Sequence, residues 1–139
     1  MNQLDWIALR AGALVALVFA VPFSVAARWV ADNNSDSSSA AATWLSLAAL
    51  VGFVLGGGVA AWVQQRRLPL AHAIVCVTGT YLIAQSVFIA VKLLRGGSVS
   101  WLGVMFNLTA VVFAGFIGGT LGNALQRRGL APRSLGGDR

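Results

Sequence analysis

The chain has 139 residues, of which 58% are hydrophobic and 10% are charged. A soluble domain usually carries about 25% charged residues, so this composition excludes an ordinary soluble fold and requires lipid as the solvent for much of the chain. The net charge of +6 lies mostly at the ends of apolar segments, which is where membrane topology signals occur. We therefore expect no nucleic-acid partner, and the length allows one compact domain.

The first apolar segment contains no charged residue from Ala11 to Ala27, which is long enough to begin a membrane-spanning helix of about 20 residues. Trp6 suits an anchor at headgroup level, and Pro22 predicts a kink. An alternative interpretation is a cleavable signal peptide, because Arg10 precedes an apolar stretch that ends in small residues. We favour a retained helix.

Three further apolar segments follow the first one. Between the first and second lies the most polar stretch, residues 32–39, which predicts a solvated loop. Pro69 suits the first turn of the third helix, and Gly96-Gly97-Ser98 predicts a turn before the fourth. The predicted helices cover about residues 9–30, 42–64, 70–92 and 100–126. The sequence therefore predicts one four-span domain, residues 1–126, and a basic tail without fixed structure, residues 127–139.

These segments predict an all-α, integral membrane four-helix bundle. In such a bundle one side of the membrane collects Arg10, Arg66, Arg67, Arg127, Arg128, Arg133 and Arg139. The other side collects Arg28, Lys92 and Arg95. Because basic residues accumulate on the cytoplasmic side, we predict a multi-pass protein of the bacterial cell membrane with both termini in the cytoplasm.

Two glycine-rich stretches resemble each other, in the second and the fourth predicted helix. Each has Gly-Phe, then adjacent glycines, then Gln-Arg-Arg, and both would cross the membrane in the same direction. Two parallel helical-hairpin repeats would explain the likeness. The distance from Gly-Phe to Gln-Arg-Arg differs by two residues between the copies, so convergence explains it equally well.

Small residues recur three or four positions apart on both of these helices, which allows helix backbones to approach closely in lipid. Replacing Gly56 or Gly118 by Leu should therefore disturb assembly. The predicted packing residues are Gly52, Gly56, Ala60, Gly115, Gly118, Gly119 and Gly122.

No catalytic motif stands out in the chain. The four acidic residues, Asp5, Asp32, Asp36 and Asp138, all fall outside the predicted spans and match no hydrolase motif. His72 and Cys76 are four positions apart, but a tetrahedral metal site needs about four ligands and the chain has no other His or Cys. We therefore predict no enzyme, no metal and no cofactor.

The third predicted helix carries a polar face of Thr78, Tyr81, Gln85 and Lys92. This face could line a permeation path, or it could hydrogen-bond to Asn107 of the fourth helix at about 0.6 kcal/mol per bond. We favour the structural interpretation, because a proton-coupled transporter would normally place an acid inside the membrane. A basic rim that could attract anionic lipid headgroups, or only fix orientation, consists of Arg66, Arg67, Arg127 and Arg128.

The glycine- and alanine-rich stretches at residues 56–61, 69–73 and 114–122, with Arg66-Arg67 between the first two, resemble the YrzE-like small bacterial membrane proteins. The resemblance covers about residues 10–125. It implies a four-helix bacterial membrane protein of unknown function and supplies no catalytic residue.

The sequence therefore favours a small structural or accessory protein of the lipid bilayer. It would pack with itself, as a homo-oligomer, or with a membrane-protein partner through its glycine-rich faces. The alternative is a small oligomeric channel or transporter with a polar path along the third helix.

Overall fold

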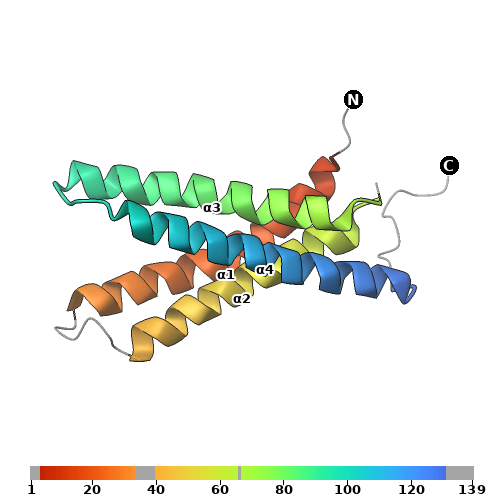
Figure 1. Ribbon diagram of the computed structural model, residues 1–139, viewed down its shortest axis with the longest axis horizontal. Coiled ribbons are helices and arrows are strands. Elements are labelled where there is room, and N and C mark those ends of the chain that lie inside the picture. The colour runs from red at the N-terminus through yellow and green to blue at the C-terminus, as the bar shows by residue number, and fades with distance from the viewer. Residues whose placement is uncertain (1–3, 34–39, 66, 131–139) are drawn as a thin grey trace.

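A computed structural model describes residues 4–33, 40–65 and 67–130. These residues form four helices, α1 (Trp6–Asn33), α2 (Ala40–Val63), α3 (Pro69–Leu94) and α4 (Trp101–Arg127) (Figure 1). Each helix is long and apolar enough to cross a membrane, so the predicted fold class of a membrane four-helix bundle is confirmed. The largest differences from the predicted boundaries are in α1, which is longer than predicted at both ends. This helix also continues without interruption through Pro22.

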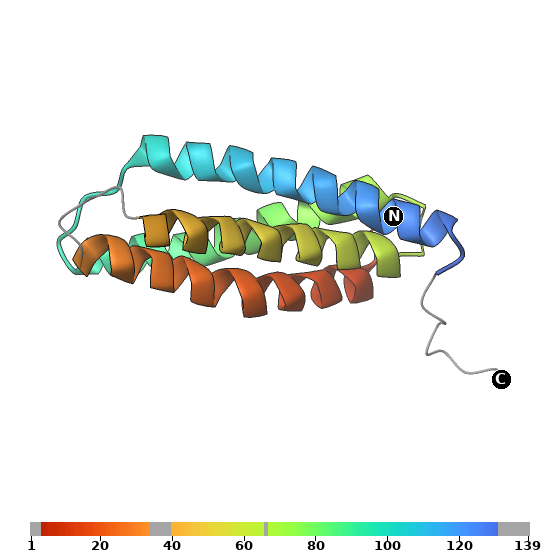
Figure 2. The ribbon, with the colours of Figure 1, turned by 90° about the horizontal axis from the view of Figure 1, so that it is seen from below.

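The helices form two antiparallel hairpins, α1–α2 and α3–α4, that cross each other (Figures 1 and 2). The hairpins lie together at the end that carries Trp6 and Arg127, which we call the basic end. They diverge toward the opposite end, which carries Asn33 and Trp101 and which we call the loop end (Figure 1). The bundle is therefore closed in one half and splayed in the other.

Polar side chains define two of the helix starts. The Asp5 carboxylate accepts hydrogen bonds from the backbone N–H groups of Ile7 and Ala8, at 3.0 and 3.3 Å. The Ser100 hydroxyl accepts one from the Gly103 N–H at 3.3 Å. Each bond satisfies a donor that the first turn of a helix leaves without a partner.

Proline and glycine mark the boundaries of α3 and α4. Pro69 lies in the first turn of α3, as predicted. Gly96 and Gly129 follow the last turns of α3 and α4 with φ of +74°, and the backbone bonds around them follow the Schellman pattern. Glycine adopts this left-handed conformation without the steric cost that a Cβ would add.

The α1–α2 contact uses small residues on both helices. A Cβ added at Gly56 would lie 2.6 Å from the Ala16 Cβ and 2.7 Å from the Gly12 carbonyl oxygen. A Cβ at Gly52 would lie 2.9 Å from the Ala20 nitrogen. Hydrogen at these positions therefore allows the backbones to touch, which supplies the van der Waals contact that drives helix association in lipid.

The two glycine-rich stretches pack on each other and on α3. A Cβ at Gly118 would meet the backbone of α2 at the Val54 carbonyl oxygen, and 2.8 Å from the Gly58 nitrogen. Gly119, on a neighbouring face of α4, contacts α3, where an added Cβ would lie 2.9 Å from the Ala73 Cβ. The other predicted packing residues, Ala60, Gly115 and Gly122, are buried as well.

These contacts change the predicted role of the glycine rows. Each predicted glycine meets another helix of the same chain. α2 contacts the other three helices. α1 and α4 do not contact each other within the described residues. The glycine rows therefore build the fold of one chain and are not left exposed for a second protein.

Hydrogen bonds join α2 to α4 at the basic end. The Gln126 side-chain amide donates to the carbonyl oxygens of Trp62 and Gln64, at 2.8 and 2.9 Å. The Gln64 amide donates in turn to the Gln126 side-chain oxygen at 3.3 Å. Gln126 therefore satisfies carbonyl groups that the end of α2 leaves open.

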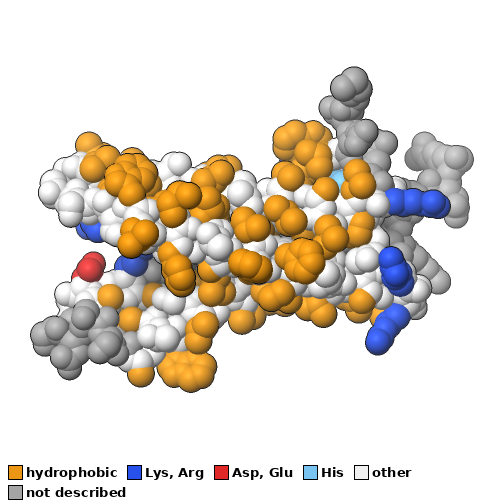
Figure 3. All heavy atoms as spheres, in the orientation of Figure 1, with side chains coloured by type: hydrophobic (Ala, Val, Ile, Leu, Met, Phe, Trp, Pro, Cys, Tyr) orange, Lys and Arg blue, Asp and Glu red, His pale blue; other side chains and the backbone are white. Residues whose placement is uncertain are grey.

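The outer surface is apolar along the length of the bundle (Figure 3). Exposed hydroxyl groups on it return to their own helix: Ser86 donates to the Leu82 carbonyl at 2.7 Å, and Thr109 to the Met105 carbonyl at 3.0 Å. Such bonds satisfy polar groups where no water is present. This surface fits contact with the hydrocarbon of a bilayer.

Candidate functional site

The splayed half of the bundle contains a recess of about 500 Å³ between the two hairpins. All four helices contribute to its wall, from the loop end down to the middle of the bundle. Figure 3 shows the hollow from the side, with charged groups at its mouth. Its polar lining residues are Ser24, Arg28, Thr43, Ser46, Tyr81, Gln85 and Asn107.

Arg28 is the charged residue of this recess. Its Nη2 donates a hydrogen bond to Oε1 of Gln85 at 3.2 Å, which links α1 to α3. The guanidinium carbon lies 4.3 Å from the centre of the Phe88 ring, a cation–π distance. These two contacts hold the guanidinium across the gap between the hairpins, and Arg can donate five N–H bonds in all.

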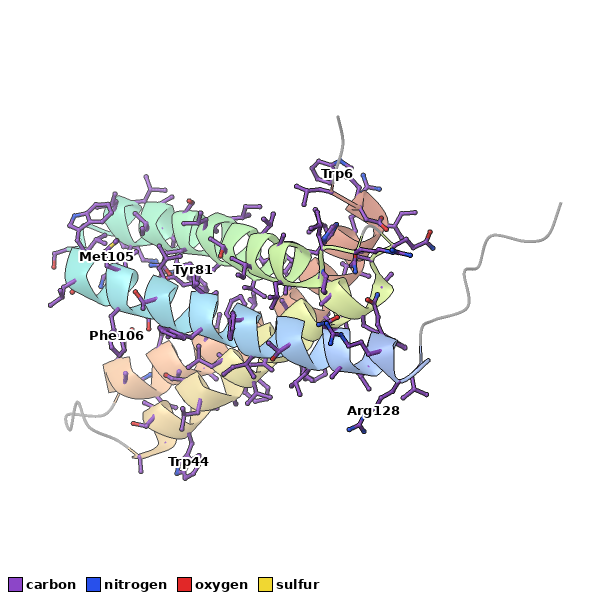
Figure 4. All side chains as sticks on the ribbon, turned by 45° about the vertical axis from the view of Figure 1, so that its right-hand side comes forward. Trp6, Trp44, Tyr81, Met105, Phe106 and Arg128 are labelled. Atoms are coloured by element: carbon purple, nitrogen blue, oxygen red, sulfur yellow. The ribbon has the colours of Figure 1, made fainter. Side chains whose placement is uncertain are left out.

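The floor of the recess is apolar. Phe53 and Tyr81 meet edge to face, with ring centres 6.3 Å apart. The Tyr81 hydroxyl donates to the Val104 carbonyl oxygen at 3.1 Å, so its polar group is already used. Ala20 and Val111 complete the floor. Tyr81 and Phe106 lie on the side of the α3–α4 hairpin that faces the other hairpin (Figure 4).

The predicted polar face of the third helix divides in the structure. Tyr81 and Gln85 line the recess, together with Asn107 of α4. Thr78 and Lys92 do not line it, and the Thr78 hydroxyl has no hydrogen-bond partner among the described residues. Gln85 bonds to Arg28, and no bond between Gln85 and Asn107 is formed.

Arg28 is the functional candidate that the sequence did not reveal. Its position beside Trp29 at the edge of an apolar run predicts a span boundary, so the sequence indicates only a topological role for it. The signal that could have identified it is a matching side chain on another helix, Gln85. Sequence alone does not show that α1 and α3 bring these two residues together.

Other charged residues lie near the loop end without lining the recess. Arg28, Lys92 and Arg95 lie in the loop-end half of the chain, where Asp32 is the acidic residue that the structure describes. Asp32 is one helical turn beyond Arg28, but no ion pair joins them. The predicted loop at 32–39, which includes Asp36, falls outside the described residues from 34 onward.

The described lining includes no His, Cys, Asp or Glu. No group of three or more such residues that could hold a metal exists in the described part of the chain. The recess therefore offers an Arg fork, an amide pair and hydroxyl groups, which can bind and orient a molecule by hydrogen bonds and charge.

His72 and Cys76 lie in the closed half, away from the recess. The His72 Nε2 accepts a bond from the Asp5 backbone N–H at 2.8 Å, and Nδ1 lies 2.8 Å from the Leu68 carbonyl oxygen. The Cys76 thiol donates to the Leu9 carbonyl at 3.5 Å. Both residues are buried and connect α1 to α3.

The predicted anionic-lipid rim is exposed at the basic end. Arg67, Arg127 and Arg128 are on the surface, and Figure 3 shows basic side chains gathered there. Arg66 lies outside the described residues, as does the tail from residue 131.

Comparisons with known proteins find no match: no family model, no curated protein and no solved structure is significantly similar to the chain.

Proposed function

We propose that this membrane protein binds a small molecule in the recess and belongs to the binding or transport class of membrane proteins. The observation that supports this proposal is a recess of about 500 Å³ lined by Arg28 and Gln85, within the range of about 300–1,000 Å³ of small-molecule pockets.

The recess does not continue into the closed half of the bundle. On the basic-end side of Tyr81, α1 meets α2 at Gly56 and α2 meets α4 at Gly118, with backbones in contact. A continuous path along α3 would have to pass these contacts. The geometry therefore favours a one-sided binding site over the open channel that the polar face could also suggest.

A structural or accessory protein is the second candidate. An accessory protein must present a contact surface to itself or to a partner, and the glycines expected for that purpose are used inside the chain. Such a protein would have to use the exposed apolar surface in their place.

We also propose that the protein is not an enzyme, that it belongs to the YrzE-like proteins, and that it lies in a bacterial cell membrane. With the basic end in the cytoplasm, the recess would open on the outer side of that membrane.

Thiol accessibility tests the proposal. In a Cys76→Ala background in lipid nanodiscs, Ser24→Cys places a thiol in the recess wall, and Val25→Cys places one at the same depth on the exposed surface. We expect a water-soluble alkylating reagent to modify Ser24→Cys and to spare Val25→Cys. Equal protection of both thiols would contradict a water-accessible recess.

The same variant tests the orientation of the protein. A membrane-impermeant reagent added to intact cells should modify Ser24→Cys. Modification only after the cells are opened would place the recess on the cytoplasmic side.

A further inference from the structure

We propose that the recess binds a single-chain amphiphile with a carboxylate or phosphate head, with the head on Arg28 and the chain on the apolar floor. This inference rests on the proposed function and names its ligand class. It follows from how polarity, charge and depth change along the recess.

The mouth selects an anion. Arg28 uses one N–H for Gln85, and no carboxylate of the described residues pairs with it. A planar guanidinium fork matches a carboxylate or phosphate with two parallel bonds. Gln85 and Phe88 fix the orientation of the fork, so little side-chain freedom is lost when an anion binds.

The floor selects a hydrocarbon chain. Ala20, Phe53 and Val111 offer no polar group there, and the Tyr81 hydroxyl is bonded to Val104. Water in contact with such walls would lack hydrogen-bond partners, which are what make a buried water stable. An inorganic anion would fill the mouth and leave this part unfilled.

The depth of the two parts matches the bilayer. Trp29, Trp44 and Trp101 are exposed near the loop end, where Trp marks the headgroup level. Arg28 adjoins Trp29, so its guanidinium lies near that level. Ala20 is eight residues earlier in α1, roughly 12 Å deeper along the helix. An amphiphile from the adjacent leaflet would keep its head and chain at their usual depths.

The volume favours one chain over two. About 500 Å³ is the size of a pocket for one small molecule, in the lower half of the usual range of about 300–1,000 Å³. We therefore infer a fatty acid or an alkyl phosphate, and not a two-chain phospholipid.

Protection of the recess thiol tests this inference. Ser24→Cys in the Cys76→Ala background, in nanodiscs of neutral lipid, is alkylated in the presence of dodecanoate, dodecyl phosphate, dodecyltrimethylammonium or inorganic phosphate. We expect dodecanoate and dodecyl phosphate to slow alkylation in a saturable way, and the cationic amphiphile and inorganic phosphate to leave it unchanged. A two-chain anionic lipid, phosphatidylglycerol, added to the nanodisc should also leave it unchanged.

Two variants assign the effect to Arg28. Arg28→Gln should raise the dodecanoate concentration for half-protection at least about tenfold, because a hydrogen bond to a charged group is lost. Arg95→Gln removes a cation from the same end without touching the recess and should behave as the parent. Ser98→Cys, in the exposed turn after α3, should be alkylated at an unchanged rate in every mixture, which controls for changes in membrane charge.

The outcomes separate the two proposals. If Ser24→Cys is not alkylated at all, the proposed function fails. If it is alkylated but dodecanoate does not protect it, or the cationic amphiphile protects equally, or Arg28→Gln keeps full protection, the ligand class is wrong. Protection by phosphatidylglycerol would identify a two-chain lipid as the occupant and would also overturn the inference, as would protection by inorganic phosphate alone.

Discussion

His72 connects the first turns of α1 and α3 through its ring. The side chain is 0% exposed, and both ring nitrogens have partners: Nε2 accepts from the Asp5 N–H, and Nδ1 lies 2.8 Å from the Leu68 carbonyl oxygen. The acceptor at Nε2 and the carbonyl at Nδ1 require the neutral tautomer with its proton on Nδ1. His72 is therefore a structural residue of the closed half.

Removing this ring should destabilise the bundle. We expect His72→Ala to lower the free energy of unfolding by about 2–4 kcal/mol, because it leaves a cavity and a buried N–H without an acceptor. His72→Phe restores the volume and should still cost about 1–3 kcal/mol. Unfolding in mixed micelles with a denaturing detergent measures both values.

Asp5→Asn is the matched control, because the bond to His72 comes from the backbone N–H of residue 5 and the amide oxygen can still cap α1. Its cost should stay below about 1 kcal/mol. Wild-type stability of His72→Phe would show that these hydrogen bonds do not hold the two helices together.

At the residue scale the sequence revealed three of the seven polar residues that line the recess. Tyr81, Gln85 and Asn107 stood out because polar groups within apolar runs are rare. Arg28 did not stand out, since an Arg at the edge of a span is the usual signal for its end. Arg28 is a residue of the recess, and not only a span boundary, because Gln85 lies beside it. That proximity depends on how the hairpins cross.

The close contacts between the helices depend on glycine. The two glycine-rich stretches, on α2 and α4, lie against each other as parallel helices, and small residues recur at each contact. In lipid the hydrophobic effect does not drive helices together, so close packing has to supply the stabilisation. One added methyl group at such a contact forces the backbones apart.

The two glycines Gly118 and Gly79 make this testable. We expect Gly118→Ala to destabilise the protein by about 1–3 kcal/mol, because the new Cβ would collide with the Val54 carbonyl and the Gly58 nitrogen. Gly79→Ala, also within a helix, meets nothing within 4 Å and should be neutral or stabilise by up to about 1 kcal/mol. Thermal unfolding in a mild detergent compares them.

Equal destabilisation by both substitutions would show that helix propensity or handling, and not close packing, sets the cost. A larger loss for Gly118→Leu than for Gly118→Ala would agree with the packing account, since the longer side chain separates α2 and α4 further.

The elements themselves could be predicted from the sequence with little loss. Apolar run lengths located four spans, and Pro69 marked the start of α3 because proline fits a first helical turn. The glycine rows indicated close contact but not its partner. Such glycines could pack equally well against a second chain. They pack within this chain because α2 lies against the other three helices.

The whole molecule combines a closed half and an open half. Backbone contacts at Gly56 and Gly118, and the ties made by His72 and Gln126, hold the basic end together. At the loop end, where the hairpins diverge, the described residues join α1 to α3 through the Arg28–Gln85 hydrogen bond. Sequence could not predict this difference, because all four spans are similarly apolar.

We propose that a water-accessible recess enters the bundle from the loop end and stops at its middle. Single cysteines along α1 at Ala31, Ala27, Ser24 and Ala20 follow the wall from mouth to floor. The native Cys76, buried in the closed half, lies beyond the floor. Alkylation rates in nanodiscs for these positions trace how far water reaches.

We expect rates that are high at Ala31→Cys, lower at Ser24→Cys, and small at Ala27→Cys and Ala20→Cys, where the parent side chains are buried, with the native Cys76 unreactive in the folded protein. Rapid alkylation of Cys76 would contradict the account by showing an open path through the closed half. Uniform protection of all the α1 positions below Ala31 would contradict it by showing that the hairpins pack together along their whole length.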